Sequence, residues 1–495
     1  MQRGIEMQSL HVISDLHLGG GAGFQIFGSV AELVWLIEHV AALPQPGLHT
    51  LLINGDFVDF LAEEPSLPFD PDGATVKLDD IWDRFHLIFG ALQKLVATPD
   101  RLLILNLGNH DVELALPWVR ARLAHKLTGG DAAAHARLLI VTDGTGVRCQ
   151  VGSASVVCVH GNEVDSWNVV DYERLRRIGR DRQFGLTPEA WIPNAGTQLV
   201  VDVMNGIKRR YPFVDLLKPE KEGVLPILAA LDTGAHRKLL DIAAVAGRRA
   251  WDSARMRTGF LDEGSAGADA LQDTYRPLGV LGSHDARRKS QMLLTDVEAA
   301  WREGMAPIDL VRGTQAQQLG FWSAARDFFS GKPRHEVLRE ALEHLDRDRS
   351  FDPATPDPTY RDLDAAMGAD IDLLLAGHTH LERSLKRNRG RGHYFNSGTW
   401  ARLIRIEPDL RADEQAFEAL FRLLDGGTMP ALDGARISGG GVASRELVLR
   451  LNTVVVVEKT AAGPTCASLR HVEPAPPGGS IELKHAAGAA EWIGA

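Results

Sequence analysis

The sequence predicts an α/β fold in which strands and helices alternate along the chain. Three short apolar runs, at 10–14, 50–54 and 101–107, are separated by stretches of helical periodicity at 29–42 and 78–96. Polar residues follow each apolar run directly. This alternation favours a largely parallel sheet with helices on its faces.

Each element has its own signal in the sequence. The apolar runs LHVIS, TLLIN and RLLILNL have the length and composition of buried strands. The helix predicted at 29–42 has apolar residues at helical spacing and ends before Pro44. Two further apolar runs, SVVCVH at 155–160 and IDLLLAG at 371–377, predict additional strands.

The middle of the chain differs from its two ends in composition and in its secondary-structure pattern. From 166 to 370 it is rich in arginine, mostly helix-like and poor in strand signals. Its candidate helices are 198–208, 237–254 and 335–346. Strand-like segments return after residue 370 and continue as far as NTVVVVEK at 452–459. We therefore expect one domain, built from 1–165 and 371–495, that is interrupted by a helical insertion or cap at 166–370.

The composition is that of a globular protein. Of the 495 residues, 44% are hydrophobic and 24% are charged, which excludes a disordered chain and a collagen-like repeat. The formal net charge of −11 argues against a broadly basic nucleic-acid binder, although a local basic groove stays open. The three cysteines are far apart and odd in number, which fits a reducing compartment better than a disulfide framework.

The chain shows no export or membrane signal. Its first residues lack the pattern of a secretory signal peptide. No run approaches the roughly 18–20 apolar residues that are needed to span a bilayer. We therefore expect a soluble cytoplasmic protein without a transmembrane segment; the sequence leaves its oligomeric state open.

Five polar clusters each follow a predicted strand directly in the sequence. In chain order they are Asp15-Leu16-His17, Gly55-Asp56-Phe57-Val58-Asp59, Gly108-Asn109-His110-Asp111, His160-Gly161-Asn162 and Gly377-His378-Thr379-His380. The carboxyl ends of parallel strands meet at one edge of a sheet, where ligands bind in open α/β folds. We therefore expect the five clusters to converge on that edge. The glycines before Asp56 and Asn109 suit tight turns where the backbone approaches a ligand.

The clusters supply imidazoles, carboxylates and one side-chain amide. The seven candidate metal ligands are Asp15, His17, Asp56, Asn109, His160, His378 and His380. Such nitrogen and oxygen donors favour Mn, Fe or Zn, whereas cages of oxygen alone favour Mg or Ca. One metal ion takes about four protein ligands, so seven ligands with one shared carboxylate suit two cations about 3.5–4 Å apart.

In this order, the segments DLH, GDFVD, GNHD, HG and GHTH resemble the signature of the calcineurin-like metallophosphoesterases. The resemblance covers 8–162 and 371–400 and implies a four-layer αββα sandwich of two mixed sheets, here with a large, mostly helical insertion. The ligands it implies for the first metal ion are Asp15, His17, Asp56 and His380. Those it implies for the second are Asn109, His160, His378 and again Asp56, which bridges the two ions.

The resemblance also implies roles for two residues that are not ligands. His110 resembles the family histidine that stabilises the phosphoryl group or protonates the leaving oxygen, and Asp59 resembles its carboxylate partner. A histidine tuned by a carboxylate is suited to this proton transfer. The implied reaction is hydrolysis of a phosphate mono- or diester, or of a pyrophosphate, by a metal-bridging hydroxide. The expected metal is manganese, with iron or zinc as alternatives.

The expected substrate is a small phosphorylated molecule, a nucleotide or a lipid precursor. Phe60 departs from the Asp-Arg-Gly segment of the family's Ser/Thr protein phosphatases, and His110 departs from the arginine of its UDP-diacylglucosamine pyrophosphatases. Two alternatives stay open: a nuclease, which would need a basic groove, and a catalytically silent metal-binding scaffold on the same fold.

Two further features have both a functional and a structural interpretation. The arginines at 174–182 could contact an anionic substrate, but we favour a solvated helix face that nearby acids balance. Asp111 could support the metal site, but we favour a cap for the helical segment that follows it.

Overall fold

The computed structural model separates into two compact units, which we treat one at a time. The residues it describes are 6–218, 333–342, 349–439, 442–460, 463–474 and 480–494. Unit 1 comprises Met1–Val201, Arg349–Arg402 and Arg450–Ala495, and unit 2 comprises Asp202–Asp348 and Leu403–Leu449. The domain boundaries expected from the sequence, at 165 and 371, lie at other positions, and that division remains a prediction.

The larger sheet of unit 1 has eight strands, in the order β17-β16-β15-β2-β3-β4-β5, with β18 paired to β16. Its strands are β2 (Ser9–Ile13), β3 (His49–Asn54), β4 (Arg101–Asn106), β5 (Leu138–Val141), β15 (Thr453–Lys459), β16 (Thr465–Glu473), β17 (Glu482–His485) and β18 (Trp492–Ile493). Strands β2 to β5 are parallel, as predicted, whereas β15 joins β2 in the antiparallel direction. The sheet is therefore mixed.

A second sheet of six strands has the order β1-β6-β7-β8-β10-β9. Its strands are β1 (Glu6–Met7), β6 (Val147–Val151), β7 (Ala154–Cys158), β8 (Leu373–Ala376), β9 (Arg383–Lys386) and β10 (His393–Asn396). The pairs β7–β8 and β8–β10 are parallel, and β6–β7 and β9–β10 are antiparallel. The apolar runs at 155–160 and 371–377 thus form strands of this sheet and not of the sheet that contains β2, β3 and β4.

Alternating side chains place the two sheets face to face. Leu52 of β3 lies in one buried apolar cluster with Val156 of β7 and Leu375 of β8, so this cluster fills the space between the sheets. Leu51 and Ile53 point the other way, into the cluster formed with the helices that follow β2 and β3. This period of two is that of strands buried on both faces.

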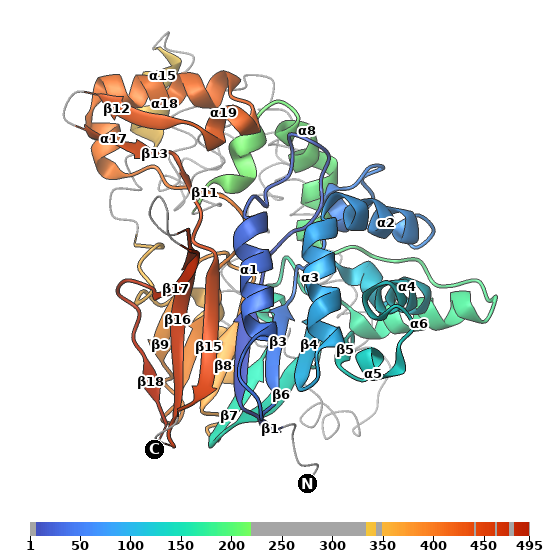
Figure 1. Cartoon of the computed structure of the whole chain (residues 1–495). Coiled ribbons are helices and arrows are strands. Elements are labelled where there is room, and N and C mark those ends of the chain that lie inside the picture. Colours follow the sequence, from blue (N-terminus) through green and yellow to red (C-terminus); the bar gives the residue numbers. More distant parts are fainter. Residues whose placement is uncertain are drawn as a thin grey trace, which may run out of the picture. The chain divides into compact units, whose positions relative to one another are not determined.

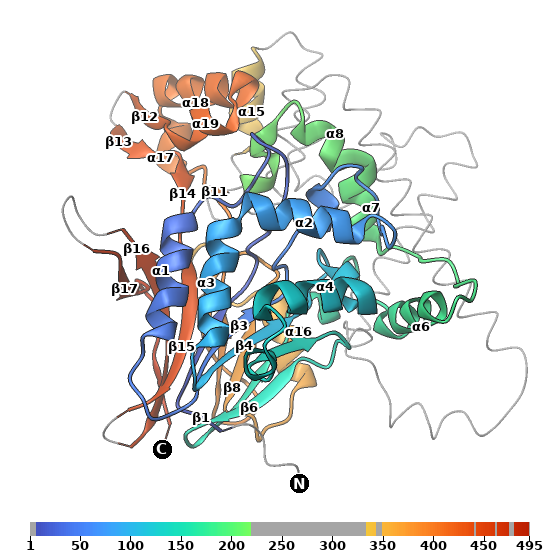
Figure 2. The same cartoon turned by 45° about the vertical axis from the view of Figure 1, so that its right-hand side comes forward.

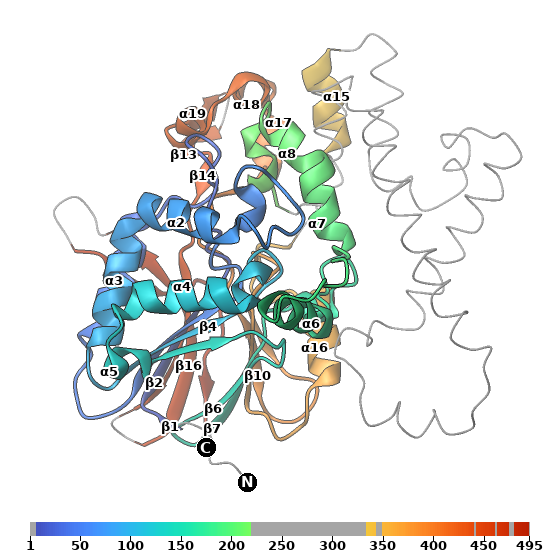
Figure 3. The same ribbon diagram turned by 90° about the vertical axis from the view of Figure 1, so that its right-hand side faces the viewer.

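Helices cover the outer faces of both sheets. The helices of unit 1 are α1 (Val30–Ala41), α2 (Ala74–Arg84), α3 (His86–Ala97), α4 (Pro117–Thr128), α5 (Ala132–His135), α6 (Tyr172–Gln183), α7 (Ala195–Leu199) and α16 (Pro358–Ala366). Figures 1 and 2 show α1 and α3 side by side over the larger sheet, where they share its outer apolar cluster. Tyr360 and Leu363 of α16 pack on the outer face of the second sheet with Val157 and Leu374. Figure 3 shows α16 on the opposite side of the strands from α3 and α5, which confirms the predicted αββα layering.

The prediction of one continuous helix at 78–96 is wrong. The segment consists of α2 and α3, which meet at Phe85 with backbone angles of φ −110° and ψ 30°. The ring of Phe85 is buried and packs edge-on against Phe27, with 5.9 Å between the ring centroids. Because apolar residues continue on both sides of the break, periodicity alone did not indicate it.

Short helical turns complete the connections of unit 1. They are the 3₁₀ turns η1 (Phe60–Ala62), η2 (Val112–Ala115) and η3 (Asn162–Val164). A π-helical turn at Val200–Met204 continues from α7 into α8 (Asn205–Lys208), so the helix predicted at 198–208 is confirmed as helical.

Unit 2 contains short helices and two small strand pairs. Besides α8, its elements are η5 (Pro212–Leu216), α15 (Arg334–Ala341), α17 (Pro408–Ala412), α18 (Glu414–Gly426), α19 (Met429–Asp433), β11 (Leu403–Ile404), β12 (Arg436–Gly439), β13 (Val442–Glu446) and β14 (Val448–Leu449). The hairpin β12–β13 is antiparallel and lies beside α18 in Figure 1, and β11 pairs with β14. The segment 408–433, which the sequence analysis assigned to a strand-rich region, is thus helical.

The described parts of the predicted insertion are mostly helical, as expected. The helix predicted at 335–346 is confirmed up to Ala341. The helix predicted at 237–254 lies outside the described residues. Within the part of the chain that the structure describes, none of the helices is long and apolar enough to cross a membrane.

Candidate metal centre

All five polar clusters lie just after the carboxyl ends of strands in unit 1. Three clusters follow β2, β3 and β4 of the larger sheet, and the other two follow β7 and β8 of the second sheet. The expectation that a single parallel sheet would gather them is therefore wrong. Two face-to-face sheets bring the clusters together, because each has its parallel strand ends at the same edge.

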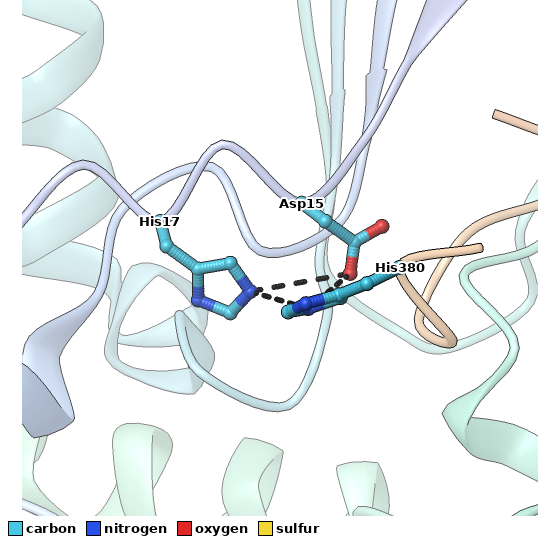
Figure 4. Close-up of side chains that lie close together, drawn as sticks. All are labelled: Asp15, His17 and His380. Carbon is cyan, nitrogen blue, oxygen red and sulfur yellow. Dashed lines mark hydrogen bonds and ion pairs between the residues drawn. The ribbon is translucent and has the colours of Figure 1, made fainter. Parts of the chain in front are cut away.

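One group consists of Asp15, His17 and His380, whose ligand atoms all lie within 4.8 Å of one another. Figure 4 shows the two imidazole rings turned toward the Asp15 carboxylate from separate segments of the chain. His17 Nε2 lies 3.0 Å from His380 Nε2, and His380 Nε2 lies 3.3 Å from Asp15 Oδ1. Donors around one cation with metal–donor distances near 2.1 Å are separated by about 3.0–3.4 Å. The spacing of this group therefore fits a shared metal ion.

A second group consists of Asp56, His160 and His378. His160 Nε2 lies 3.3 Å from Asp56 Oδ2, and the same oxygen lies 3.7 Å from His17 Nε2 in the first group. A single carboxylate oxygen thus faces a ring nitrogen of each group, which is the position a bridging ligand requires.

Asn109 carries the amide that the sequence analysis expected to bind the second ion. Its side chain is buried, and its Oδ1 makes no hydrogen bond in the described structure. A buried acceptor without a partner is costly unless another group satisfies it. Asn109 lies in the loop after β4, and the other candidate ligands lie in the loops after neighbouring strands. Coordination to a cation would satisfy its unpaired oxygen.

The backbone at the centre adopts a rare conformation. Five of the seven candidate ligands have positive φ, namely Asp15 (54°), His17 (47°), Asp56 (52°), His378 (70°) and His380 (61°). Only a few per cent of residues other than glycine adopt this left-handed region, and it costs of the order of 1–3 kcal/mol at each position. Such strain concentrated at one place is typical of a functional site.

Glycines make room for the ligands at two points. Gly55 has a φ of 91°, and a Cβ there would overlap the ring of His160. A Cβ on Gly108 would overlap the carboxylate of Asp56. These are the two glycines expected from the sequence to sit where the backbone approaches a ligand.

Charge interactions keep the carboxylates of the centre ionised. Burial acts to raise the pKa of Asp15, but the hydrogen bond with His380 and the charge of His160 outweigh it and lower the pKa to about 2. Burial also acts to raise the pKa of Asp56, but the charges of His160 and His110 outweigh it and hold that pKa well below its usual value. Buried carboxylates that remain charged provide the anionic donors that divalent cations need.

Asp59 connects two imidazoles. Its Oδ1 lies 3.2 Å from His110 Nδ1, and its Oδ2 lies 3.2 Å from His17 Nδ1. Although burial opposes it, the charge of His110 and the hydrogen bonds of both rings hold the pKa of Asp59 below its usual range. The structure thus brings Asp59 and His110 together beside His17 and Asp56, two of the candidate ligands.

The interpretation that the sequence analysis favoured for Asp111, a cap for the following helical segment, is wrong. Asp111 occupies the N-cap position of η2, but its side chain does not cap that turn. Instead Oδ2 accepts a hydrogen bond from the Phe57 N–H and Oδ1 accepts one from the Gly108 N–H. The carboxylate is fully buried and links the loop of Asp56 to the loop of Asn109. The alternative interpretation, support of the metal site, agrees with these contacts and rested on the place of Asp111 within a ligand cluster.

The sequence analysis missed the contact of Asp165 with His378. Asp165 Oδ2 lies 3.0 Å from His378 Nε2, and the pKa of Asp165 is shifted down because the hydrogen bond and charge of His378 outweigh the effect of burial. The sequence analysis used this residue only as the last position before the insertion.

The arginines of α6 do not offer unpaired charge to a substrate. Arg174 and Arg177 pair with Glu189, and Arg182 pairs with Asp72. Arg176 and Arg180 pair with acids on α6 itself. The favoured interpretation, a solvated face balanced by acids, is confirmed.

The fold and the site define a class: an αββα protein with two buried aspartate–histidine groups that share a carboxylate and could hold metal ions. Residues 9–220 match the family model described as calcineurin-like phosphoesterase. This part of the chain is therefore similar to the family that the sequence motifs resemble. A comparison with curated proteins found no match.

Proposed function

We propose that this chain is a binuclear metal-dependent phosphoesterase that hydrolyses a phosphate mono- or diester, or a pyrophosphate, of a small substrate. The observation that carries the proposal is the pair of donor groups joined through Asp56 Oδ2. Asp15, His17, Asp56 and His380 would hold one cation, and Asp56, Asn109, His160 and His378 the other. When bound, two such cations acidify a coordinated water and neutralise charge on the phosphate oxygens.

The donor set favours manganese, with iron or zinc as alternatives. It combines imidazole nitrogens with carboxylate and amide oxygens and contains no thiolate, since Cys149 and Cys158 lie in the core between the sheets. Three of the four histidines have one ring nitrogen engaged by an oxygen outside the donor groups: His17 by Asp59, His160 by the Asn54 carbonyl and His378 by Asp165. The other nitrogen of each ring then carries the lone pair that a metal needs.

His110 is proposed as the group that protonates the leaving oxygen. Its side chain is 19% exposed, more than those of the ligand histidines, which have at most 13% of their side chains exposed. Asp59 accepts from Nδ1, so Nε2 is the nitrogen that would face the substrate. An imidazole held by a carboxylate can donate and regain a proton near neutral pH.

The proposal is tested by metal analysis and by hydrolysis of two chromogenic substrates, a phosphate monoester and a phosphate diester. We expect about two metal ions per chain after purification with manganese, and turnover of at least one substrate. His110→Ala should retain both ions and lower kcat by roughly 100- to 10,000-fold.

The matched control is His86→Ala, which removes an exposed histidine of α3 whose Nδ1 lies 3.1 Å from the Asp83 carbonyl oxygen. This variant should keep wild-type turnover. Two bound metal ions without turnover of either ester would favour the silent scaffold instead, and unchanged turnover in His110→Ala would remove the role assigned to His110.

A further inference from the structure

The side chain of His378 is held from outside the donor groups by Asp165. Asp165 Oδ2 lies 3.0 Å from His378 Nε2, and both side chains are largely buried. An ionised carboxylate only accepts hydrogen bonds, so the proton between them belongs to Nε2. In a neutral ring Nδ1 then carries the lone pair, and Nδ1 is the atom left to serve the group of Asp56 and His160.

Asp165 is itself fixed in place. Its Oδ1 accepts from the Trp167 N–H at 2.9 Å, and its Oδ2 also accepts from Asn168 Nδ2 at 2.8 Å. The backbone of His378 is held separately, because its N–H donates to both carboxylate oxygens of Asp15 at 2.9 and 3.1 Å. With the backbone held, the ring of His378 can still rotate and change tautomer. The hydrogen bond with Asp165 restricts both changes.

The loop that carries Asp165 is anchored to the start of α7. The carbonyl of Trp167 accepts from the Gly196 N–H at 2.8 Å. The carbonyl of Asn168 accepts from Asn162 Nδ2 at 3.1 Å and from Asn194 Nδ2 at 3.2 Å. Hydrogen bonds therefore hold the loop of Asp165 in place. A residue that orients a metal ligand needs such support.

We infer that Asp165 is a positioning residue, which selects the His378 tautomer that presents Nδ1 to the second cation. The inference rests on the proposed function for the identity of His378 as a ligand. Carboxylates that orient metal-binding histidines set affinity strongly, and their loss costs about 10- to 100-fold in metal binding.

Asp165→Asn tests this with almost no change in shape. Its amide would donate to His378 Nε2 and so favour the proton on Nδ1, which then cannot bind a cation. We expect manganese titration of the metal-free protein to show one site with wild-type affinity and one weakened by about 10- to 100-fold. Asp72→Asn is the matched control, because it makes the same change at an aspartate whose side chain is 82% exposed and pairs with Arg182. It should bind both ions as the wild type does.

The tautomer can be measured without any metal. In ¹⁵N-histidine-labelled, metal-free protein, with His378→Gln used to assign the signals, His378 should carry its proton on Nε2 in the wild type and on Nδ1 in Asp165→Asn. A wild-type ring protonated on Nδ1, or an Asp165→Asn variant that binds both ions with wild-type affinity, would overturn the inference. A wild-type protein that binds no manganese but shows the expected tautomers would overturn the proposed function and leave the positioning contact in place.

Discussion

At the scale of the residue, the candidate centre depends on where protons sit on its imidazole rings. His17, His160 and His378 each have one ring nitrogen next to an oxygen that lies outside the two donor groups. These oxygens belong to Asp59, to the Asn54 backbone and to Asp165, and they fix the opposite nitrogen as a lone-pair donor. In the proposed metal centre, each of these rings would therefore present its lone pair to a cation without a change of tautomer.

Asp56 is the residue whose replacement should affect both metal ions. Asp56→Asn keeps the shape of the side chain but removes the charge that faces His17 and His160. We expect the metal content to fall to one ion or fewer per chain and kcat to drop by roughly 100-fold or more. Elemental analysis after dialysis, together with initial rates, measures both effects. Asp72→Asn, at a side chain that is 82% exposed, should change neither, and two retained ions in Asp56→Asn would contradict the bridging role.

A second residue-scale prediction concerns stability at acid pH. Burial, reinforced by the positive charges of His39, Arg470 and His49, lowers the pKa of His11 from 6.5 to about 3. Below pH 6.5 the unfolded chain binds a proton at His11 that the folded chain does not bind, so stability is complete above pH 6.5 and is lost as the pH falls toward 3. At pH 5 the loss reaches up to about 2 kcal/mol, from 1.36 kcal/mol per pH unit.

The variant His11→Leu should remove this dependence. Its urea-unfolding midpoint should fall less than that of the wild type between pH 7 and pH 5, because leucine has no proton to bind. His86→Ala, at an exposed histidine, should follow the wild-type curve. Parallel curves for the wild type and His11→Leu would show that His11 does not govern the acid response.

At the scale of the element, the ligands sit on loops that are held to one another. Asp111 joins the loop after β3 to the loop after β4 through two backbone N–H groups, at 2.9 and 2.7 Å. Asp56 accepts the His110 N–H at 2.9 Å, which ties the same two loops a second time. These bonds hold Asp56, which has a left-handed backbone, in a fixed position beside the loop of Asn109.

Removal of the Asp111 carboxylate should therefore weaken both the fold and the metal centre. Asp111→Ala leaves two buried N–H groups without a partner, at about 1–3 kcal/mol each. We expect the free energy of unfolding to drop by about 2–5 kcal/mol, with weaker manganese binding. Asp131→Ala removes the side-chain cap of α5 and should cost only about 1 kcal/mol without affecting manganese. Equal losses in the two variants would contradict the linking role of Asp111.

The sequence predicted which segments form strands better than it predicted which strands pair with one another. The runs at β2, β3, β4, β7 and β8 are apolar enough to identify each as a strand, and the cluster after each was found from the same pattern. Nothing in an apolar run states which sheet it joins, because that depends on pairing with strands far along the chain. The break at Phe85 and the positive φ of the ligands were also invisible, since both arise from contacts made only in the folded state.

At the scale of the whole molecule, the C-terminal part shows where local patterns stop being sufficient. β15, at Thr453–Lys459, was identified as a strand, but its place beside β2 follows from the register Val455–Val12, across more than 400 positions. The helix α18 was missed although Phe417, Leu420 and Leu424 are buried at helical spacing. The strand-like segments on both sides of it dominated the interpretation of that region.

Metal removal should destabilise unit 1 as a whole. The candidate ligands follow five strands of two sheets, so the complete donor set exists only when both sheets are assembled. A ligand that binds only the folded state stabilises it by about 2.7 kcal/mol at a free concentration 100 times its Kd. We therefore expect calorimetry to show an unfolding transition that rises in temperature with manganese and falls with a chelator. Asp56→Asn should respond little, whereas Asp72→Asn should respond as the wild type does. If the wild-type transition were the same with manganese and with chelator, the five strand ends would not be assembling a metal site, and the proposed phosphoesterase chemistry would lose its physical basis.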